Sequence, residues 1–139
     1  MSKADNVALV KRAYKAFLKG DIKAVLKTTA DDIEWNTPEV EGMPFGGLRR
    51  GKAEVEEFFR MLVEHEEVLE FEPQEFIAEG KQVVVIGRYR GRVKATGQIA
   101  ESPFVQVFTI KAGKIARFFE LMDTANAERA YRKASTAAR

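Results

Sequence analysis

The segment QIAESPFVQVFTIKAGKIARFFELMD, residues 98–123, carries the clearest signal of fold class. It reads as two strands of alternating apolar positions joined by a short turn at KAGK, residues 111–114. Side chains two residues apart in a strand lie on the same face of the sheet. Each strand therefore presents one polar side chain among apolar ones, in the sets Phe104, Gln106 and Phe108, and Phe118, Glu120 and Met122. A carboxylate is costly to bury in such surroundings, so the direction in which Glu120 points matters for function.

The length of the turn sets the faces that Gln106 and Glu120 occupy. A three-residue loop, residues 112–114, would pair Lys111 with Ile115. Counting back along both strands then places Gln106 opposite Glu120 on one face. A loop of two or four residues would place them on opposite faces. Glycine fits the three-residue turn without excluding the other lengths.

Two further strand segments precede this pair, VLEFEPQEFIAEG at residues 68–80 and KQVVVIGRYRGRVKATG at residues 81–97. Glycine-bearing turns separate all four segments, which predicts an antiparallel meander. The N-terminal half has helical periodicity instead. It predicts three helices with the apolar positions Val7, Val10, Tyr14 and Phe17, then Ile22, Val25 and Leu26, then Val55, Phe58, Phe59, Leu62 and Val63.

The connection between the second and third helices is rich in proline and glycine. DDIEW at residues 31–35 predicts a short strand, and NTPEVEGMPFGGLRRG at residues 36–51 predicts a loop. We expect this loop to be a mobile flap, with Met43, Pro44 and Phe45 forming an apolar underside that closes over a cavity.

Helices followed by strands predict an α+β fold in a single domain, residues 1–139. The helices would pack on one face of a curved, mostly antiparallel sheet and enclose a cone-shaped cavity. The alanine-rich segment 123–139 predicts a short C-terminal helix capped by Asp123, with a frayed tail.

Composition excludes several functional classes. The chain has no cysteine, which rules out disulfides and thiolate chemistry, and its net charge of +2 gives no reason to expect nucleic acid or an anionic membrane as a partner. Arg88, Arg90, Arg92 and Lys94 alternate along one strand, but no exposed aromatic platform accompanies them, so we interpret this face as solvated. The charged N-terminal segment is neither a signal peptide nor a membrane span, so a cytoplasmic location is the default expectation.

Three segments together resemble the nuclear transport factor 2-like (NTF2-like) superfamily, in its SnoaL-like and ketosteroid-isomerase-related branch. They are YKAFLKGDIKAVLKTTADDIEW at residues 14–35, PFGGLRRGKAEVEEFF at 44–59 and ATGQIAESPFVQVFTIKAGKIARFFELMDTANA at 95–127. The resemblance covers nearly the whole chain and implies the cone-shaped α+β fold. It does not imply one reaction, because this fold hosts isomerases, cyclases, hydrolases, dehydratases and non-catalytic modules.

The catalytic residues of ketosteroid isomerase do not carry over to this chain. Its aspartate base falls on Asn36 or Thr37, neither of which is a base near neutral pH. Its oxyanion-hole tyrosine falls on Ala13, which leaves Tyr14 one residue away on a different side of the helix. Its protonated aspartate falls near Gln106. The resemblance therefore implies that the steroid isomerase machinery is absent.

In SnoaL-like polyketide cyclases a histidine and an aspartate occupy the last two strands, at the places of Gln106 and Glu120. The resemblance favours a shared face for these two residues. We predict Glu120, Gln106 and Asn36 as catalytic residues, with Trp35 as an alternative donor to Asn36, and burial should raise the pKa of Glu120. The predicted pocket residues are Tyr14, Phe17, Trp35, Phe45, Phe58, Phe59, Leu62, Phe104, Phe108, Phe118 and Met122.

The predicted function is cofactor-free and metal-free acid–base chemistry on a small, largely apolar carbonyl compound. The alternatives are a non-catalytic ligand-binding module and a dimerisation module with a vestigial pocket. A homodimer is expected through the sheet face opposite the helices, because that face would be too apolar to leave exposed. The same alternation assigns to it Val83, Val85, Val105, Val107, Phe119 and Leu121.

Overall fold

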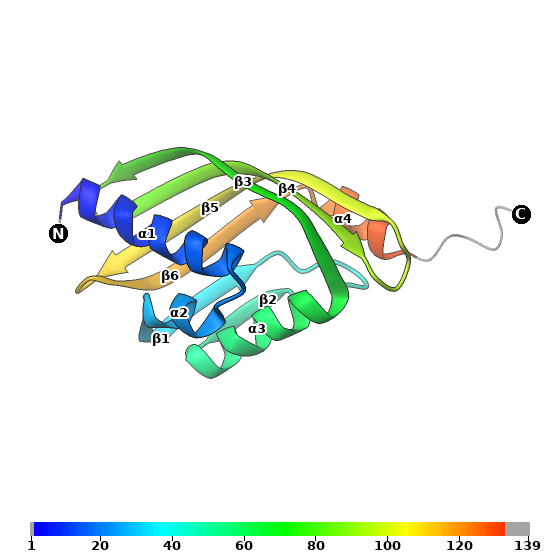
Figure 1. Ribbon diagram of the computed structural model, residues 1–139, viewed down its shortest axis with the longest axis horizontal. Helices are drawn as coiled ribbons and strands as arrows, with labels where there is room; N and C mark the ends of the chain where they lie inside the picture. The colour runs from blue at the N-terminus through cyan, green and yellow to red at the C-terminus, as the bar shows by residue number, and fades with distance from the viewer. Residues whose placement is uncertain (1, 133–139) are drawn as a thin grey trace, which may run out of the picture.

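The computed structural model describes residues 2–132 and contains a six-stranded sheet with four helices (Figure 1). In chain order the elements are α1 (Lys3–Leu18), α2 (Ile22–Lys27), β1 (Thr29–Thr37), β2 (Gly47–Arg50), α3 (Lys52–His65), β3 (Glu66–Glu79), β4 (Gln82–Val93), β5 (Ile99–Lys111), β6 (Lys114–Met122) and α4 (Thr124–Tyr131). The strand order is β2-β1-β6-β5-β4-β3, and only β1 and β6 run parallel.

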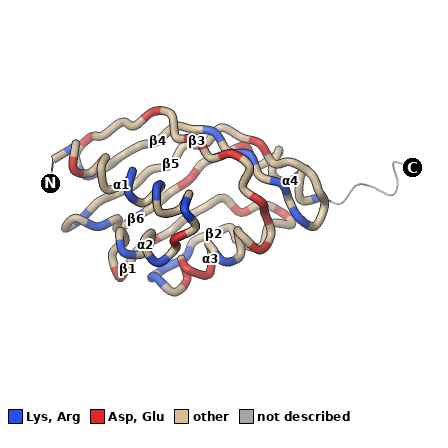
Figure 2. Tube along the Cα trace, viewed as in Figure 1, with Lys and Arg blue, Asp and Glu red and all other residues tan. Residues whose placement is uncertain are grey.

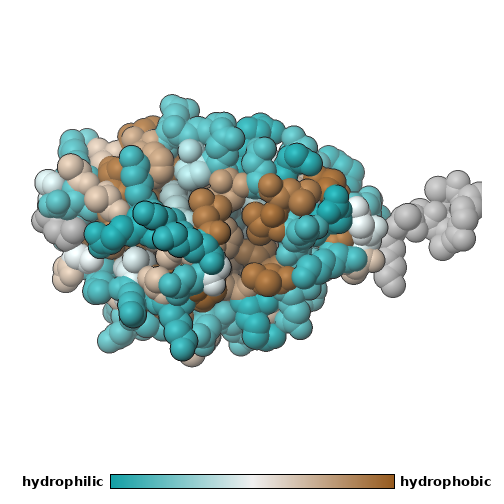
Figure 3. Space-filling view, in the orientation of Figure 1, coloured by the Kyte–Doolittle hydropathy of each residue, from teal (hydrophilic) through white to brown (hydrophobic). Residues whose placement is uncertain are grey.

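Helices α1, α2 and α3 cover one face of the curved sheet, and α4 lies at one end of it (Figure 1). This arrangement confirms the predicted α+β cone. Figure 3 shows apolar side chains gathered around a hollow on the helix-bearing face. Among the described residues, no helix is long and apolar enough to cross a membrane.

Side-chain caps fix the starts of three helices. Ser2 and Asp5 form a reciprocal capping box at the start of α1. Asp21 accepts a hydrogen bond from the backbone N–H of Ala24 in α2. Asp123 accepts one from the backbone N–H of Asn126 in α4, as predicted. The predicted frayed tail falls mostly on residues 133–139, which lie outside the described part of the chain.

The β5–β6 hairpin differs from the predicted three-residue loop. Lys111 pairs with Lys114, so the loop has two residues, Ala112 and Gly113, with φ of 49° and 75°. Two successive positive φ angles are typical of the tight turns that join antiparallel strands. A register shift between Thr109 and Ile110 inserts one extra residue into β6. The extra residue moves the rest of β6 back to the alternate face of the sheet. Gln106 therefore does pair with Glu120, as the three-residue loop would have required.

The expected loop at residues 36–51 is partly strand. β1 continues to Thr37, and β2 pairs with it antiparallel, with Trp35 opposite Arg49. The irregular connection is therefore limited to residues 38–46. The prolines and glycines correctly predicted an interruption of regular secondary structure, but they did not reveal the short edge strand β2 that follows it.

The outer face of the sheet differs from the prediction in β4. Val83 pairs with Phe108 and Val85 with Gln106, so both valines face the helices and are fully buried. Their neighbours Val84 and Ile86 take the outer positions. The corrected apolar outer face comprises Val84, Ile86, Val105, Val107, Phe119 and Leu121.

The arginines of β4 also lie on the outer face, where acidic and basic positions intersperse along β3 and β4 (Figure 2). Arg88 bonds Glu101 at 3.2 Å and Arg92 bonds Glu67 at 2.7 Å, with all four side chains well exposed. Exposed ion pairs of this kind contribute little to stability. The arginines follow Val84 and Ile86 along β4, so the charged, solvated part of the outer face lies beside its apolar part.

Candidate functional site

A cavity of about 130 Å³ lies between the inner face of the sheet and the helices. An engineered cavity of similar size in another protein admits benzene, so the space suits a molecule of about one ring. Its walls are aromatic. Trp35 stacks on Phe118 with ring centroids 3.9 Å apart, and Phe71 stacks on Phe104 with ring centroids 5.1 Å apart. Each predicted pocket residue lines it, namely Tyr14, Phe17, Trp35, Phe45, Phe58, Phe59, Leu62, Phe104, Phe108, Phe118 and Met122.

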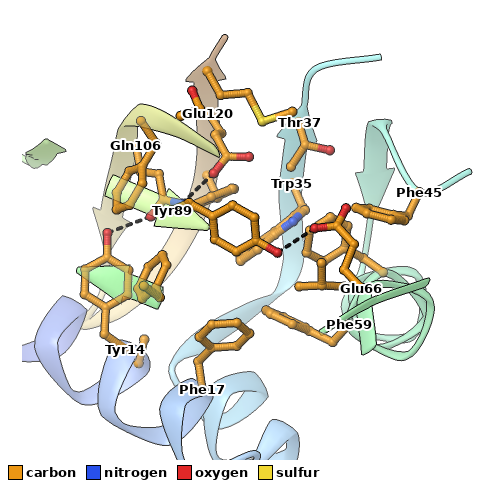
Figure 4. Close-up of a pocket in the computed structure, with 18 of the residues that line it drawn as sticks. Tyr14, Phe17, Trp35, Thr37, Phe45, Phe59, Glu66, Tyr89, Gln106 and Glu120 are labelled. Carbon is orange, nitrogen blue, oxygen red and sulfur yellow. Dashed lines mark hydrogen bonds between the residues drawn. The ribbon is translucent and has the colours of Figure 1, made fainter. Parts of the chain in front are cut away.

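Glu120 points from β6 into this cavity, as expected (Figure 4). Its Oε2 accepts a 2.6 Å hydrogen bond from Nε2 of Gln106, while no described residue bonds Oε1. Burial raises the pKa of Glu120 from 4.5 to about 7, against a lowering by the bond from Gln106, and the charge of Glu66 adds to the rise. The carboxyl group is thus able to hold or release a proton near neutral pH.

Tyr14 extends the polar chain across the cavity. Its hydroxyl donates a 2.7 Å hydrogen bond to Oε1 of Gln106, so the amide is fixed from both ends (Figure 4). Burial, and then the negative charge of Glu120, raise the pKa of the Tyr14 hydroxyl far above its usual range. Tyr14 therefore remains a protonated donor, and the amide N–H of Gln106 is directed at Glu120.

One sequence-based expectation for this region needs correction, although Tyr14 lines the cavity as predicted, together with its neighbour Ala13. Asn36 does not line it, because it occupies the alternate position of β1, beside Leu48 and Phe119 on the other face. Contrary to the prediction, Asn36 is therefore not placed to donate a hydrogen bond to a ligand in the cavity.

A second polar cluster, which the sequence did not predict, lies at the other side of the cavity around Glu66 (Figure 4). The buried carboxylate of Glu66 accepts a 2.5 Å hydrogen bond from Tyr89 and another from Tyr131 at the end of α4. Burial, and then the charge of Glu66, raise the pKa of both phenols far above the usual range. Each phenol hydroxyl of this cluster thus donates to a different oxygen of the Glu66 carboxylate.

The charge of the cavity is one-sided. Its lining includes four carboxyl groups, those of Glu66, Glu101, Glu120 and Asp123, and no lysine, arginine or histidine from the described residues. Within residues 2–132 no three potential metal ligands come together. The cavity therefore offers hydrogen bonds and aromatic faces to a ligand but no positive charge for an anion.

Comparison with known proteins agrees with this architecture. A model of the SnoaL-like domain matches residues 10–118. The chain belongs to the SnoaL-like family. No match is found among curated proteins.

Solved structures similar to this SnoaL-like chain fall in the NTF2-like superfamily. An NTF2-like protein from Burkholderia xenovorans is 36% identical, with a TM-score of 0.86 over 95% of this chain and 99% of that one. An NTF2-like protein of unknown function from Burkholderia pseudomallei is 31% identical, with a TM-score of 0.82 over 94% and 98%. TerC, co-crystallised with polyporic acid, is 27% identical, with a TM-score of 0.78 over 91% and 98%.

The Glu66 cluster of this SnoaL-like protein left only a partial signal in the sequence. Alternation along β4 places Tyr89 on the inner face, which predicts a buried phenol in need of a partner. Gly91 follows on the same face, and a Cβ there would overlap the Tyr89 hydroxyl and lie 2.8 Å from Oε1 of Glu66. Only glycine leaves room for this pair. Which glutamate near the end of α3 accepts the bond could not be read from the sequence.

Proposed function

We propose that this SnoaL-like protein is a cofactor-free enzyme that uses Glu120 to move a proton on a small, largely apolar carbonyl compound. One observation carries the proposal: a carboxyl group with a pKa of about 7 has one oxygen directed into an aromatic cavity and free of bonds to the described residues. A group that is half protonated near neutral pH serves equally as proton acceptor and donor.

The proposed reaction begins with ionised Glu120 taking a proton from a carbon next to the substrate carbonyl. The C–H bond breaks, its electron pair forms the C=C bond of an enolate, and the negative charge moves to the carbonyl oxygen. Protonated Glu120 then returns the proton to a carbon of the same molecule, which completes a tautomerisation or double-bond shift without another reactant. Gln106 and Tyr14 keep the carboxyl group oriented through both steps.

The comparison with TerC supports the proposal at the level of ligand class. That protein, at 27% identity, was crystallised with polyporic acid, so a relative of this fold was studied with a small organic ligand. The cavity of this chain, with its aromatic lining and volume of about 130 Å³, fits a ligand that is smaller and largely apolar.

The test uses 2-indanone, a small bicyclic ketone whose CH2 groups are acidified by both the carbonyl and the fused benzene ring. In D2O near pH 7 the protein should accelerate exchange of these protons for deuterium, followed by proton NMR. Glu120→Gln keeps the shape but cannot take a proton, so it should lower the accelerated rate by at least about 100-fold. The matched control Glu75→Gln changes an exposed glutamate on the outer face and should leave the rate unchanged. Binding of 2-indanone without any accelerated exchange would favour the non-catalytic binding module instead.

A further inference from the structure

We propose that the indole N–H of Trp35 and the hydroxyl of Thr37 form a binding subsite for the carbonyl oxygen of the ligand, beside Glu120. This inference rests on the proposed function for its role in catalysis, but the subsite itself is a claim about binding. A ligand that fits the subsite carries an acceptor oxygen adjacent to an acidic C–H bond.

The first observation is that both groups are buried without a partner. Trp35 is 6% exposed and Thr37 is 4% exposed, and both side chains line the cavity. Neither Nε1 of Trp35 nor Oγ1 of Thr37 has a hydrogen-bond partner among residues 2–132. A buried polar atom without a partner loses its bond to water and gains nothing in exchange, so such atoms are rare in folded proteins. A ligand acceptor would supply the partner that these donors lack.

The second observation is that the other hydroxyl groups of the cavity are already committed. Each of them donates to a protein acceptor: Tyr14 to Gln106, Tyr89 to Glu66, Thr28 to the carbonyl of Val25, Thr29 to that of Leu26, and Ser102 to that of Pro103. By elimination, the hydroxyl and indole donors left for a ligand lie on β1. Their positions, two residues apart on the inner face, are fixed by the strand.

The third observation is the position of these donors relative to Glu120. β1 and β6 are parallel neighbours, with Trp35 opposite Phe118 and Asn36 opposite Phe119, so Thr37 is next to Glu120 in register. Both side chains point into the cavity from adjacent strands (Figure 4). In a carbonyl compound only two bonds separate the oxygen from the carbon that loses its proton. A donor and a base on neighbouring strands therefore match the two ends of that unit.

These donors would also contribute to catalysis, because negative charge develops on the substrate oxygen during the reaction. As Glu120 removes the proton, negative charge moves to the substrate oxygen, and the cavity lining in the described chain supplies no cation to receive it. Fixed neutral donors in a water-poor site stabilise such an oxygen more in the transition state than in the ground state. Trp35 and Thr37 are the groups in place to do so.

Access to the subsite requires a local adjustment, because both polar atoms are shielded from water. Met43 and Met122 line the same cavity. Methionine side chains are unbranched and repack at little cost, so they can give way to a ligand oxygen. The same lining carries four carboxyl groups, which disfavours anionic carboxylates as ligands and leaves neutral ketones and esters as the preferred class.

The test is the carbonyl stretch of 2-indanone labelled with carbon-13 at C2, measured by isotope-edited infrared spectroscopy on the bound probe. In the wild type the band should lie at or below its position in water, because hydrogen bonds weaken the C=O bond. In Thr37→Val, which keeps the shape and removes the hydroxyl, and in Trp35→Phe, it should move up towards its position in hexane. Thr37→Ser should restore the wild-type band, and the control Thr109→Val, on the outer face of β5, should leave it in place.

Binding constants provide a second readout. Thr37→Val should weaken 2-indanone about fivefold, the effect of one net hydrogen bond, and leave unchanged the binding of 2-methyleneindane, which has the same shape without an acceptor. An unchanged band in both Thr37→Val and Trp35→Phe, or no binding of 2-indanone at millimolar concentration, would overturn the subsite. Glu120→Gln separates the two claims: it should abolish proton exchange yet keep the low carbonyl band. A low band without any exchange in the wild type would leave the subsite standing and refute the enzyme.

Discussion

Tyr14 and Gln106 are 92 positions apart in the chain, yet the hydroxyl of Tyr14 donates a 2.7 Å hydrogen bond to the amide oxygen of Gln106. This bond ties the first helix to the centre of the sheet. It also fixes the orientation of the amide, whose N–H then bonds Glu120. The ionisation of Glu120 is thereby linked to side chains on two other elements.

The first prediction concerns the pKa of Glu120. Gln106→Leu removes the one contact that lowers this pKa, so the value should rise above the wild-type value of about 7. Carbon-13 NMR of the Glu120 carboxyl through a pH series measures it. Gln82→Leu, at an exposed position at the start of β4, is the control and should leave the titration unchanged. A wild-type midpoint near 4.3, the ordinary value for glutamate, would show that Glu120 is not a tuned acid–base group.

The second prediction concerns stability. Glu120 titrates near 4.5 when unfolded and near 7 when folded, so the unfolded state releases its proton first as pH rises. The free energy of unfolding should therefore fall between about pH 4.5 and 7 and lose up to about 3 kcal/mol above that range. Glu120→Gln has no titrating group at this position, so its free energy of unfolding lacks this pH dependence. Urea unfolding followed by circular dichroism should show equal stabilities at pH 4 and a more stable variant at pH 8; a constant difference across pH would refute the prediction.

The third prediction concerns the attachment of α4. Tyr131 bonds Glu66, packs near Phe45 of the 38–46 connection and ends α4. Tyr131→Phe should loosen α4, so that its amides exchange hydrogen at least about tenfold faster while β4 and β5 stay protected. Tyr89→Phe removes the other bond to Glu66 but leaves α4 attached, and it should not speed exchange there. Equal protection of α4 in both variants would argue against the attachment.

The fourth prediction concerns the flap. The connection 38–46 packs Val40, Met43 and Phe45 against the core but has no strand partners among the described residues. Its amides should exchange faster than those of the central strands in the free protein and become more protected with 2-indanone bound. If the connection is as protected as β5 both with and without the probe, it is no flap.

The fifth prediction concerns assembly. Val84, Ile86, Val105, Val107, Phe119 and Leu121 form an apolar outer face, where Leu121 is 53% exposed in the single chain. We propose that two copies pack through this face as a homodimer. Light scattering at micromolar concentration should give twice the chain mass. Val107→Glu, at the middle of the face, should give the monomer mass, whereas the peripheral Glu75→Gln should remain dimeric.

Sequence patterns predicted the element types, the meander and the aromatic lining of the cavity, because periodicity and glycine-bearing turns are local signals. They did not determine register. The shared face of Gln106 and Glu120 was expected from a three-residue turn but results from a two-residue turn with a compensating bulge. Val83 and Val85 were assigned to the wrong face because β4 contains valines at successive positions, and only its pairing with β5 distinguishes them.

The cluster around Glu66 could not be predicted for a similar reason. Glu66 is one of several glutamates around the end of α3, and only the folded chain selects it to meet Tyr89 and Tyr131. Tyr14 was predicted to line the cavity, but its hydrogen bond to Gln106 was not predicted, because a shift of one residue rotates a helical position by about 100°. Contacts between distant segments depend on backbone placement at the scale of a single residue.

Trp35 is the only tryptophan of the chain, and it forms part of the cavity wall, stacked on Phe118 with its indole N–H unpaired among the described residues. The protein thus contains its own optical reporter. The emission of an indole in dry, apolar surroundings lies at short wavelength and moves to longer wavelength when a polar atom reaches the ring nitrogen. Every compound that enters the cavity should alter this single fluorescence signal. The natural ligand can therefore be sought among metabolite extracts by intrinsic fluorescence, with no label and no assumption about the reaction.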